Sequence, residues 1–156
     1  RSDVISWDEF FMRVAIAASL RSKDPKTQVG ACIADTNDRI LSVGYNGTPS
    51  GLDDDEFPWG TSEDPLFDKH NYVIHAEANA ILNYRGSLKD MQGAKVYVTL
   101  FPCQECAKTL VQAGVGEVIY LDDKYDGTEG NRVSKSVFDR CGITYRQVRL
   151  PEDALV

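Results

Sequence analysis

The chain has 156 residues, of which 42% are hydrophobic and 26% are charged, and its formal net charge is −7. This length fits one domain, which we expect to span residues 1–156. The sequence contains no signal-peptide pattern and no apolar run of the roughly 20 residues that cross a bilayer, and its acidic balance argues against a polynucleotide partner, so we expect a cytoplasmic protein that binds a small molecule.

The first predicted elements are a helix and a β-hairpin. The segment SWDEFFMRVAIAASL opens with a capping box of Ser6 and Glu9, and we expect a helix there. Its predicted apolar stripe consists of Phe10, Val14, Ala17 and Ala18. Two β-like runs, 27–35 and 39–46, flank a turn signal and predict the hairpin. Residues 46–72 are rich in Gly, Pro and Asp and indicate a long loop, which in a compact domain is more often functional than idle.

Helices and strands alternate in the second half of the chain. The patterns predict helices near 75–85, from Pro102 onward and over 132–141, with strands over 94–100, 116–122 and 143–149. Such alternation indicates parallel crossovers, while the first hairpin adds antiparallel pairing. We therefore expect an α/β fold, a three-layer α-β-α sandwich around a mixed five-stranded sheet.

Residues with metal-binding chemistry stand at two predicted helix starts. Cys103 and Cys106 follow Pro102 at a spacing that places both on one helix face, and a helix N-terminus favours the thiolate form that binds metal. His75 begins the preceding helix. Because parallel strand-helix units bring their helix N-termini to the same edge of the sheet, these three side chains are expected to meet there.

One histidine and two cysteines are three ligands suited to Zn²⁺. A structural zinc site is closed by four protein ligands, whereas a catalytic site keeps one position for water. The other cysteines, Cys32 and Cys141, show no ligand-like spacing, which favours an open site with zinc as cofactor. Glu77 is then placed to exchange protons with a zinc-activated water.

Each of these residues also has an ordinary interpretation. A histidine at a helix start is often a cap or a surface residue, a first-turn glutamate is often solvated, and a lone C-x-x-C can be a redox pair. A zinc-stabilised binding module without catalysis is a further alternative, and it requires a fourth protein ligand. The joint occurrence of H-A-E and P-C-x-x-C, with His75 and Cys103 28 positions apart, favours the catalytic metal site.

These two motifs, HAE at 75–77 and PCQEC at 102–106, match the signature of the zinc-dependent cytidine deaminase superfamily. Within it the chain resembles the deoxycytidylate (dCMP) deaminases most. The resemblance is carried by RSKDPKTQVGACI, RILSVGYNGTPSG, HAEANAIL, GAKVYVTLFPCQECAKTLVQAGVGEVIYLDDKY and FDRCGI. Together these segments cover most of residues 10–143.

The resemblance implies the reaction and its central residues. His75, Cys103 and Cys106 would bind one catalytic zinc, which activates a water for attack on C4 of the cytosine ring. Glu77 would protonate N3 and then help to protonate the departing ammonia, and the Ala76 amide would bind O2 of the pyrimidine. The product would be dUMP, the precursor for thymidylate synthesis.

The resemblance also suggests how the nucleotide is held. Asn46 would bind the sugar hydroxyl, although by itself the residue is more typical of an Asn-Gly turn, and Tyr125 would stack on the base or simply pack in the core or at the rim. The candidates for the 5′-phosphate form a cationic loop, which is otherwise solvated. They are Arg21, Ser22, Lys23 and Lys26, among which Lys23 is the favoured residue.

Regulation and assembly are further expectations from the resemblance. Relatives are commonly homohexamers that dCTP activates and dTTP inhibits, in a region matching Gly44, Tyr45, Asn46 and Gly47. The acidic run 53–56 would assist Mg²⁺ with such a triphosphate, or is a solvated loop. The 46–72 loop has no cysteine and one histidine, His70, so we expect one zinc per chain.

Another substrate remains an alternative: cytosine, guanine, a riboflavin precursor or adenosine in tRNA.

Overall fold

A five-stranded mixed sheet forms the middle of the molecule, as seen in a computed structural model that describes residues 1–53 and 55–155. The strands are β1 (Gly30–Ala34), β2 (Ile40–Tyr45), β3 (Lys95–Leu100), β4 (Glu117–Asp122) and β5 (Thr144–Gln147). Their order in the sheet is β2-β1-β3-β4-β5. β1 is antiparallel to both β2 and β3, while β3, β4 and β5 run parallel. The predicted hairpin and parallel crossovers are thus confirmed.

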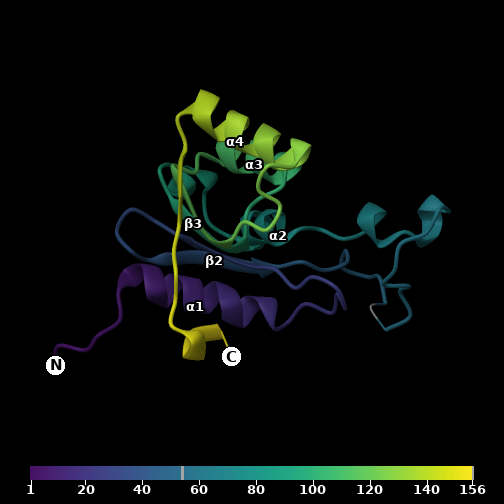
Figure 1. The fold of residues 1–156 in the computed structure, drawn as a ribbon, viewed down its shortest axis with the longest axis horizontal. Helices are drawn as coiled ribbons and strands as arrows, with labels where there is room; N and C mark the ends of the chain where they lie inside the picture. Colours follow the sequence, from purple (N-terminus) through teal and green to yellow (C-terminus); the bar gives the residue numbers. More distant parts are fainter. Residues whose placement is uncertain (54, 156) are drawn as a thin grey trace.

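Helices cover both faces of the sheet (Figure 1). On one face lies α1 (Trp7–Ser19), and on the other lie α2 (Ala76–Asn83), α3 (Gln104–Ala113) and α4 (Glu129–Cys141). After β5 the chain returns to the α1 face, where the short 3-10 helix η4 (Glu152–Leu155) contacts α1. The predicted three-layer α-β-α sandwich is confirmed. In the described part of the chain no helix is both long and apolar enough to cross a membrane.

The buried strands divide their side chains between two cores. Along β3, Val96 and Val98 face the α2–α3–α4 side, whereas Tyr97 between them faces α1. Along β4, Val118 and Ile119 alternate in the same way. This period of two follows from the pleat of a strand. Because both faces are covered by helices, these strands read as nearly continuous apolar runs.

The apolar face predicted for the first helix is wrong by one position. The buried residues of α1 are Phe11, Met12, Ala15 and Ser19, and the predicted Phe10 is 40% exposed. The sequence FFMRVAIAAS contains two adjacent apolar columns, so helical periodicity alone does not decide which one faces the sheet. Packing decides it, because Phe11 contacts the ring of the buried Tyr97 at a centroid distance of 5.2 Å.

Residues 46–72 form the predicted long loop and carry structure of their own. The loop contains two 3-10 helices, η1 (Pro65–Phe67) and η2 (Lys69–Asn71), and Phe57 packs edge-on against both Trp59 and Tyr72. One member of the acidic run 53–56, residue 54, lies outside the described residues. Asp55 in that run pairs with Lys23 at 3.3 Å, and magnesium binding by the run stays a prediction.

Gly44 sets how closely α2 lies on the sheet. A Cβ at this position would stand 2.4 Å from the Ala80 nitrogen and 2.5 Å from the Ala76 oxygen, both in the α2 backbone. We expect Gly44→Ala to lower the free energy of unfolding by about 1–3 kcal/mol, because the added methyl group would push the α2 backbone away from the sheet. Urea denaturation measures this change.

Gly60 offers the matched control, because a Cβ there would meet no atom within 4 Å. We expect Gly60→Ala to change the free energy of unfolding by no more than about 0.5 kcal/mol. Equal effects of the two substitutions would contradict the role given to Gly44.

Candidate functional site

The predicted metal ligands lie at the starts of α2 and α3. His75 is the N-cap residue of α2 and Cys103 the N-cap residue of α3, while Cys106 lies one turn into α3. The Cys103 sulfur accepts a hydrogen bond from the Cys106 amide at 3.4 Å. A two-residue bridge orients the start of α2, since Gly47 and Ile74 exchange backbone hydrogen bonds of 3.0 and 2.7 Å. Both helix N-termini therefore reach the same sheet edge, as predicted.

The three ligand atoms converge to distances that suit zinc. His75 Nδ1 lies 3.3 Å from the Cys103 sulfur and 3.4 Å from the Cys106 sulfur, and all three atoms lie within 4.8 Å of one another. Zinc bonds of about 2.0 Å to nitrogen and 2.3 Å to sulfur would separate the two atoms by about 3.6 Å at a tetrahedral centre. The donor set therefore fits Zn²⁺ with little rearrangement.

The remaining cysteines do not supply a fourth ligand. Cys32 is fully buried in the core between α1 and the sheet, where burial raises the pKa of its thiol to about 12. Cys141 is exposed at the end of α4. Among the described residues, His75, Cys103 and Cys106 are the group of histidine, cysteine and acidic side chains close enough to hold a metal. This set of three leaves a coordination position for a water or a substrate atom.

The three ligands shift one another's pKa values. A hydrogen bond from the Cys106 thiol lowers the pKa of Cys103 to about 4, with a further contribution from His75. The same contact with Cys103, together with burial, raises the pKa of Cys106, and the pKa of His75 is raised chiefly by its hydrogen bond to Cys103. The lowered pKa of Cys103 favours its thiolate form, and binding of a soft dication would displace the remaining protons of the ligands.

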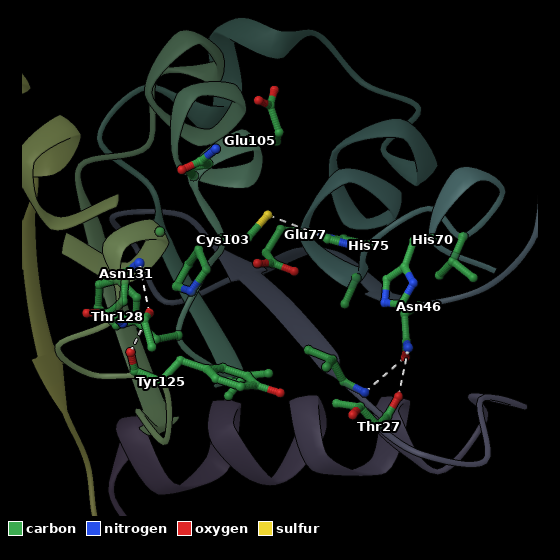
Figure 2. Close-up of a pocket in the computed structure, with 18 of the residues that line it drawn as sticks. Thr27, Asn46, His70, His75, Glu77, Cys103, Glu105, Tyr125, Thr128 and Asn131 are labelled. Carbon is green, nitrogen blue, oxygen red and sulfur yellow. Dashed lines mark hydrogen bonds between the residues drawn. The ribbon is translucent and has the colours of Figure 1, made fainter. Parts of the chain in front are cut away.

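Glu77 lies beside the ligands without being one of them. It occupies the first turn of α2 and is only 4% exposed. Burial raises the pKa of its carboxyl to about 7, against the lowering effects of its own backbone amide and of His75. In Figure 2 the Cys103 sulfur and the His75 ring face each other with the Glu77 carboxyl close by. A buried carboxyl that titrates near neutral pH is suited to proton transfer.

A cavity of about 850 Å³ opens over this cluster. Of the predicted substrate residues, its lining includes Lys26, Asn46, Ala76 and Tyr125. Figure 2 places Tyr125 on one side of the metal ligands and Asn46 on the other. This volume lies within the range of small-molecule sites, and the N–H groups of the first turn of α2, to which Ala76 belongs, have no acceptor within their helix.

The Asn46 amide takes part in the fold as well as lining the cavity. Its Oδ1 accepts from the Val29 amide at 2.9 Å, and its Nδ2 donates to the Thr27 carbonyl oxygen at 2.9 Å. A side-chain amide has two lone pairs and two N–H bonds, so each end retains capacity for one more partner. The interpretations as a structural residue and as a ligand-binding residue are compatible.

The other predicted phosphate residues lie away from the large cavity. Arg21 and Lys23 line a hollow of about 90 Å³ together with Tyr45, Gly47 and Trp59, and Asn46 borders both spaces. The Ser22 hydroxyl accepts from the Asp24 amide at 3.3 Å. Gly44 faces the backbone of α2 and contributes to packing.

The cavity wall also contains polar residues that sequence reasoning missed, among them Asp24, Lys69, His70 and Asn131. Asn131 is 7% exposed, and its Nδ2 donates to Asp123 at 2.7 Å. Its Oδ1 is the buried side-chain polar atom that lacks a hydrogen-bond partner within the described residues. A buried acceptor of this kind awaits a donor from water or a ligand. Isolated polar residues in loops and first helical turns carry no sequence signal for such a role.

Comparison with known proteins identifies relatives of the chain. The profile of the cytidine and deoxycytidylate deaminase zinc-binding region matches residues 5–122. A probable deoxycytidylate deaminase of Drosophila melanogaster is 48% identical over 153 residues, covering 94% of this chain and 74% of the relative. The deoxycytidylate deaminase of Homo sapiens is 46% identical over 148 residues, covering 94% and 82%.

A similar structure has also been solved with nucleotides bound. The dCMP deaminase of the cyanophage S-TIM5, in complex with dCMP and dUMP, superposes with a TM-score of 0.69 at 28% sequence identity. The match covers 90% of this chain and 95% of the phage protein.

Proposed function

The chain belongs to the family of deaminases that share the cytidine and deoxycytidylate deaminase zinc-binding region, and on that premise we propose that it hydrolyses dCMP to dUMP and ammonia. The observation that carries the proposal is the open His75–Cys103–Cys106 cluster with the buried Glu77 beside it. The preference for dCMP is supported by the names of the relatives and by the phage complex with dCMP and dUMP.

The residues divide the chemistry between them. Zinc held by His75, Cys103 and Cys106 would lower the pKa of a bound water toward 7. Glu77 accepts the proton of the attacking water and donates at N3 of the ring, while the new C–O bond forms at C4. It then helps to carry the proton of the new C4 hydroxyl to the 4-amino nitrogen, so that the C4 carbonyl forms, the C–N bond breaks and ammonia leaves. Its pKa of about 7 suits both directions of transfer.

The rest of the cavity would orient the nucleotide. We assign the base to the space between the Ala76 amide and the ring of Tyr125, a residue that is 49% exposed. Asn46 would bind the sugar hydroxyl with its remaining hydrogen-bonding capacity. Lys26 is the residue of the cationic loop that lines this cavity, so we assign it the 5′-phosphate.

An assay of ammonia release from dCMP, deoxycytidine, CMP and adenosine tests the proposal directly. With zinc present we expect dCMP to be the best of these substrates, with kcat/KM at least about tenfold above deoxycytidine, because a charge-assisted contact to the phosphate supports only the nucleotide. Ammonia release is followed with a coupled assay or by the ultraviolet change of the ring. No turnover of dCMP, even with dCTP added, would refute the proposal.

Regulation and assembly follow from the same family resemblance. We propose that dCTP activates and dTTP inhibits through the small hollow, whose Arg21 and Lys23 suit a polyphosphate and whose Trp59 suits a base. At about 90 Å³ the hollow holds only part of such a nucleotide. Velocity curves that neither effector alters would contradict this assignment. A homohexamer, a cytoplasmic location and the supply of dUMP for thymidylate synthesis stay predictions.

A further inference from the structure

A buried ion pair joins two loops at the wall of the cavity. Lys69 and Asp24 are each only 6% exposed, and Lys69 Nζ donates to both carboxylate oxygens of Asp24 at 2.9 Å. The two residues are 45 positions apart in the chain, and both line the cavity. A buried lysine is retained only where its charge is compensated, so this pairing fixes the two loops against each other.

On one side, the pair organises the cationic loop. Asp24 Oδ1 also accepts from the amides of Lys26 and Thr27, at 2.8 and 3.2 Å, and the Asp24 carbonyl oxygen accepts from Gln28 Nε2 at 2.6 Å. These contacts fold residues 24–28 into a tight turn of the Asx type. The Thr27 carbonyl oxygen in turn accepts a hydrogen bond from Asn46 Nδ2. One carboxylate therefore places two residues, Lys26 and Thr27, that line the cavity.

On the other side, the pair is tied to the segment that leads to the metal ligands. The Lys69 amide donates to the Gly60 carbonyl oxygen at 2.9 Å, and the Lys69 carbonyl oxygen accepts from Tyr72 and Val73 at 3.0 Å each. Val73 is two residues before His75. The position of the cationic loop is thus set relative to the start of α2 through the Lys69–Asp24 ion pair and the backbone hydrogen bonds of Lys69.

We propose that the Lys69–Asp24 ion pair is a positioning element that holds residues 24–28 as the cavity wall and thereby sets the affinity for the nucleotide. The inference rests on the proposed function. Lys69 is neutralised by Asp24, which takes two of its three N–H donors. The pair therefore acts through the residues it places, chiefly Lys26, and not through contact with the reacting atoms.

The double variant Asp24→Asn/Lys69→Met tests this role without leaving a buried charge unpaired. We expect KM for dCMP and the dissociation constant of dUMP to rise about 10- to 100-fold, since small misplacements of a binding group cost this much. We expect kcat to stay within about threefold, because the lost interaction supports ground state and transition state alike. Steady-state kinetics and calorimetry with dUMP measure these changes, and the zinc content should stay at one per chain.

Another ion pair between distant segments, that of Lys95 with Asp38, is the control, and it is partly buried. Its 2.9 Å contact joins the β1–β2 turn to β3, and neither residue lines the cavity. We therefore expect Asp38→Asn/Lys95→Met to leave KM for dCMP unchanged. Deoxycytidine provides a second readout, because its kcat/KM should fall less than that of dCMP in the Asp24/Lys69 variant.

Several outcomes would overturn the inference. An unchanged KM for dCMP in the double variant would do so, and so would a fall in kcat with loss of zinc, which would make the pair a support of the metal site. If the double variant does not fold, Asp24→Glu provides the test. Its longer side chain keeps the charge but moves the carboxylate away from the amides of Lys26 and Thr27, and KM for dCMP should still rise several-fold. Wild-type protein that leaves dCMP untouched would instead refute the proposed function.

Discussion

Replacing Glu77 with glutamine is expected to lower kcat for dCMP by on the order of 10³- to 10⁴-fold while one zinc remains bound per chain. Glutamine has nearly the same shape and fills the same buried position, but its amide cannot accept and return a proton at neutral pH. The metal ligands His75, Cys103 and Cys106 are unaltered, so zinc binding should persist. Steady-state kinetics together with metal analysis by mass spectrometry measure both quantities.

Glu105 provides the control for this substitution. It lies in the first turn of the neighbouring helix α3 and borders the same cavity, but its side chain is solvent-exposed and forms a 3.0 Å ion pair with Lys108. Glu105→Gln should change kcat by less than about threefold, because an exposed ion pair contributes little. A Glu77→Gln variant with zinc and nearly normal kcat would exclude the proton-transfer role. Loss of zinc from that variant would instead make Glu77 a support of the metal site.

The metal site could be predicted from sequence because two local signals and one topological rule agree. The spacing of Cys103 and Cys106 after a proline indicated a helix start, and His75 stood at another. Parallel crossovers bring such helix starts to one sheet edge. These inferences needed only short-range patterns and a general rule of chain connection, and the structure confirms that the three side chains converge.

The wall of the cavity could not be predicted in the same way. Lys69 lies in a loop without periodicity, and its burial depends on Asp24, 45 residues earlier. Asn131 lies in the first turn of α4, and its orientation depends on Asp123, eight residues earlier. Such pairings are set by tertiary packing, and nothing local distinguishes these residues from solvated ones. The outward position of Phe10 in α1 has the same cause, because two adjacent apolar columns compete for one face.

Cys106→Ala is expected to lower bound zinc from one per chain to below about a tenth and to reduce turnover of dCMP by more than about 10³-fold. Two protein ligands would remain, which is fewer than the three or four that zinc sites use. A ligand that binds only the folded state stabilises it by RT ln(1 + [L]/Kd). At a free zinc concentration about 1,000 times Kd, loss of zinc binding would therefore also lower the free energy of unfolding by about 4 kcal/mol. Metal analysis and thermal denaturation measure these effects.

Cys141→Ala is the matched control, because Cys141 is an exposed free thiol at the far end of α4. It should keep one zinc and normal turnover. Chelation of wild-type zinc should reproduce the loss of activity and stability, and added zinc should restore both in wild type but not in Cys106→Ala. Full zinc content in the Cys106 variant would show that the ligand set is wrong. Two zinc ions in the wild-type chain would contradict the single site, since Cys32 is enclosed in the opposite core and the 46–72 loop offers His70 without a cysteine.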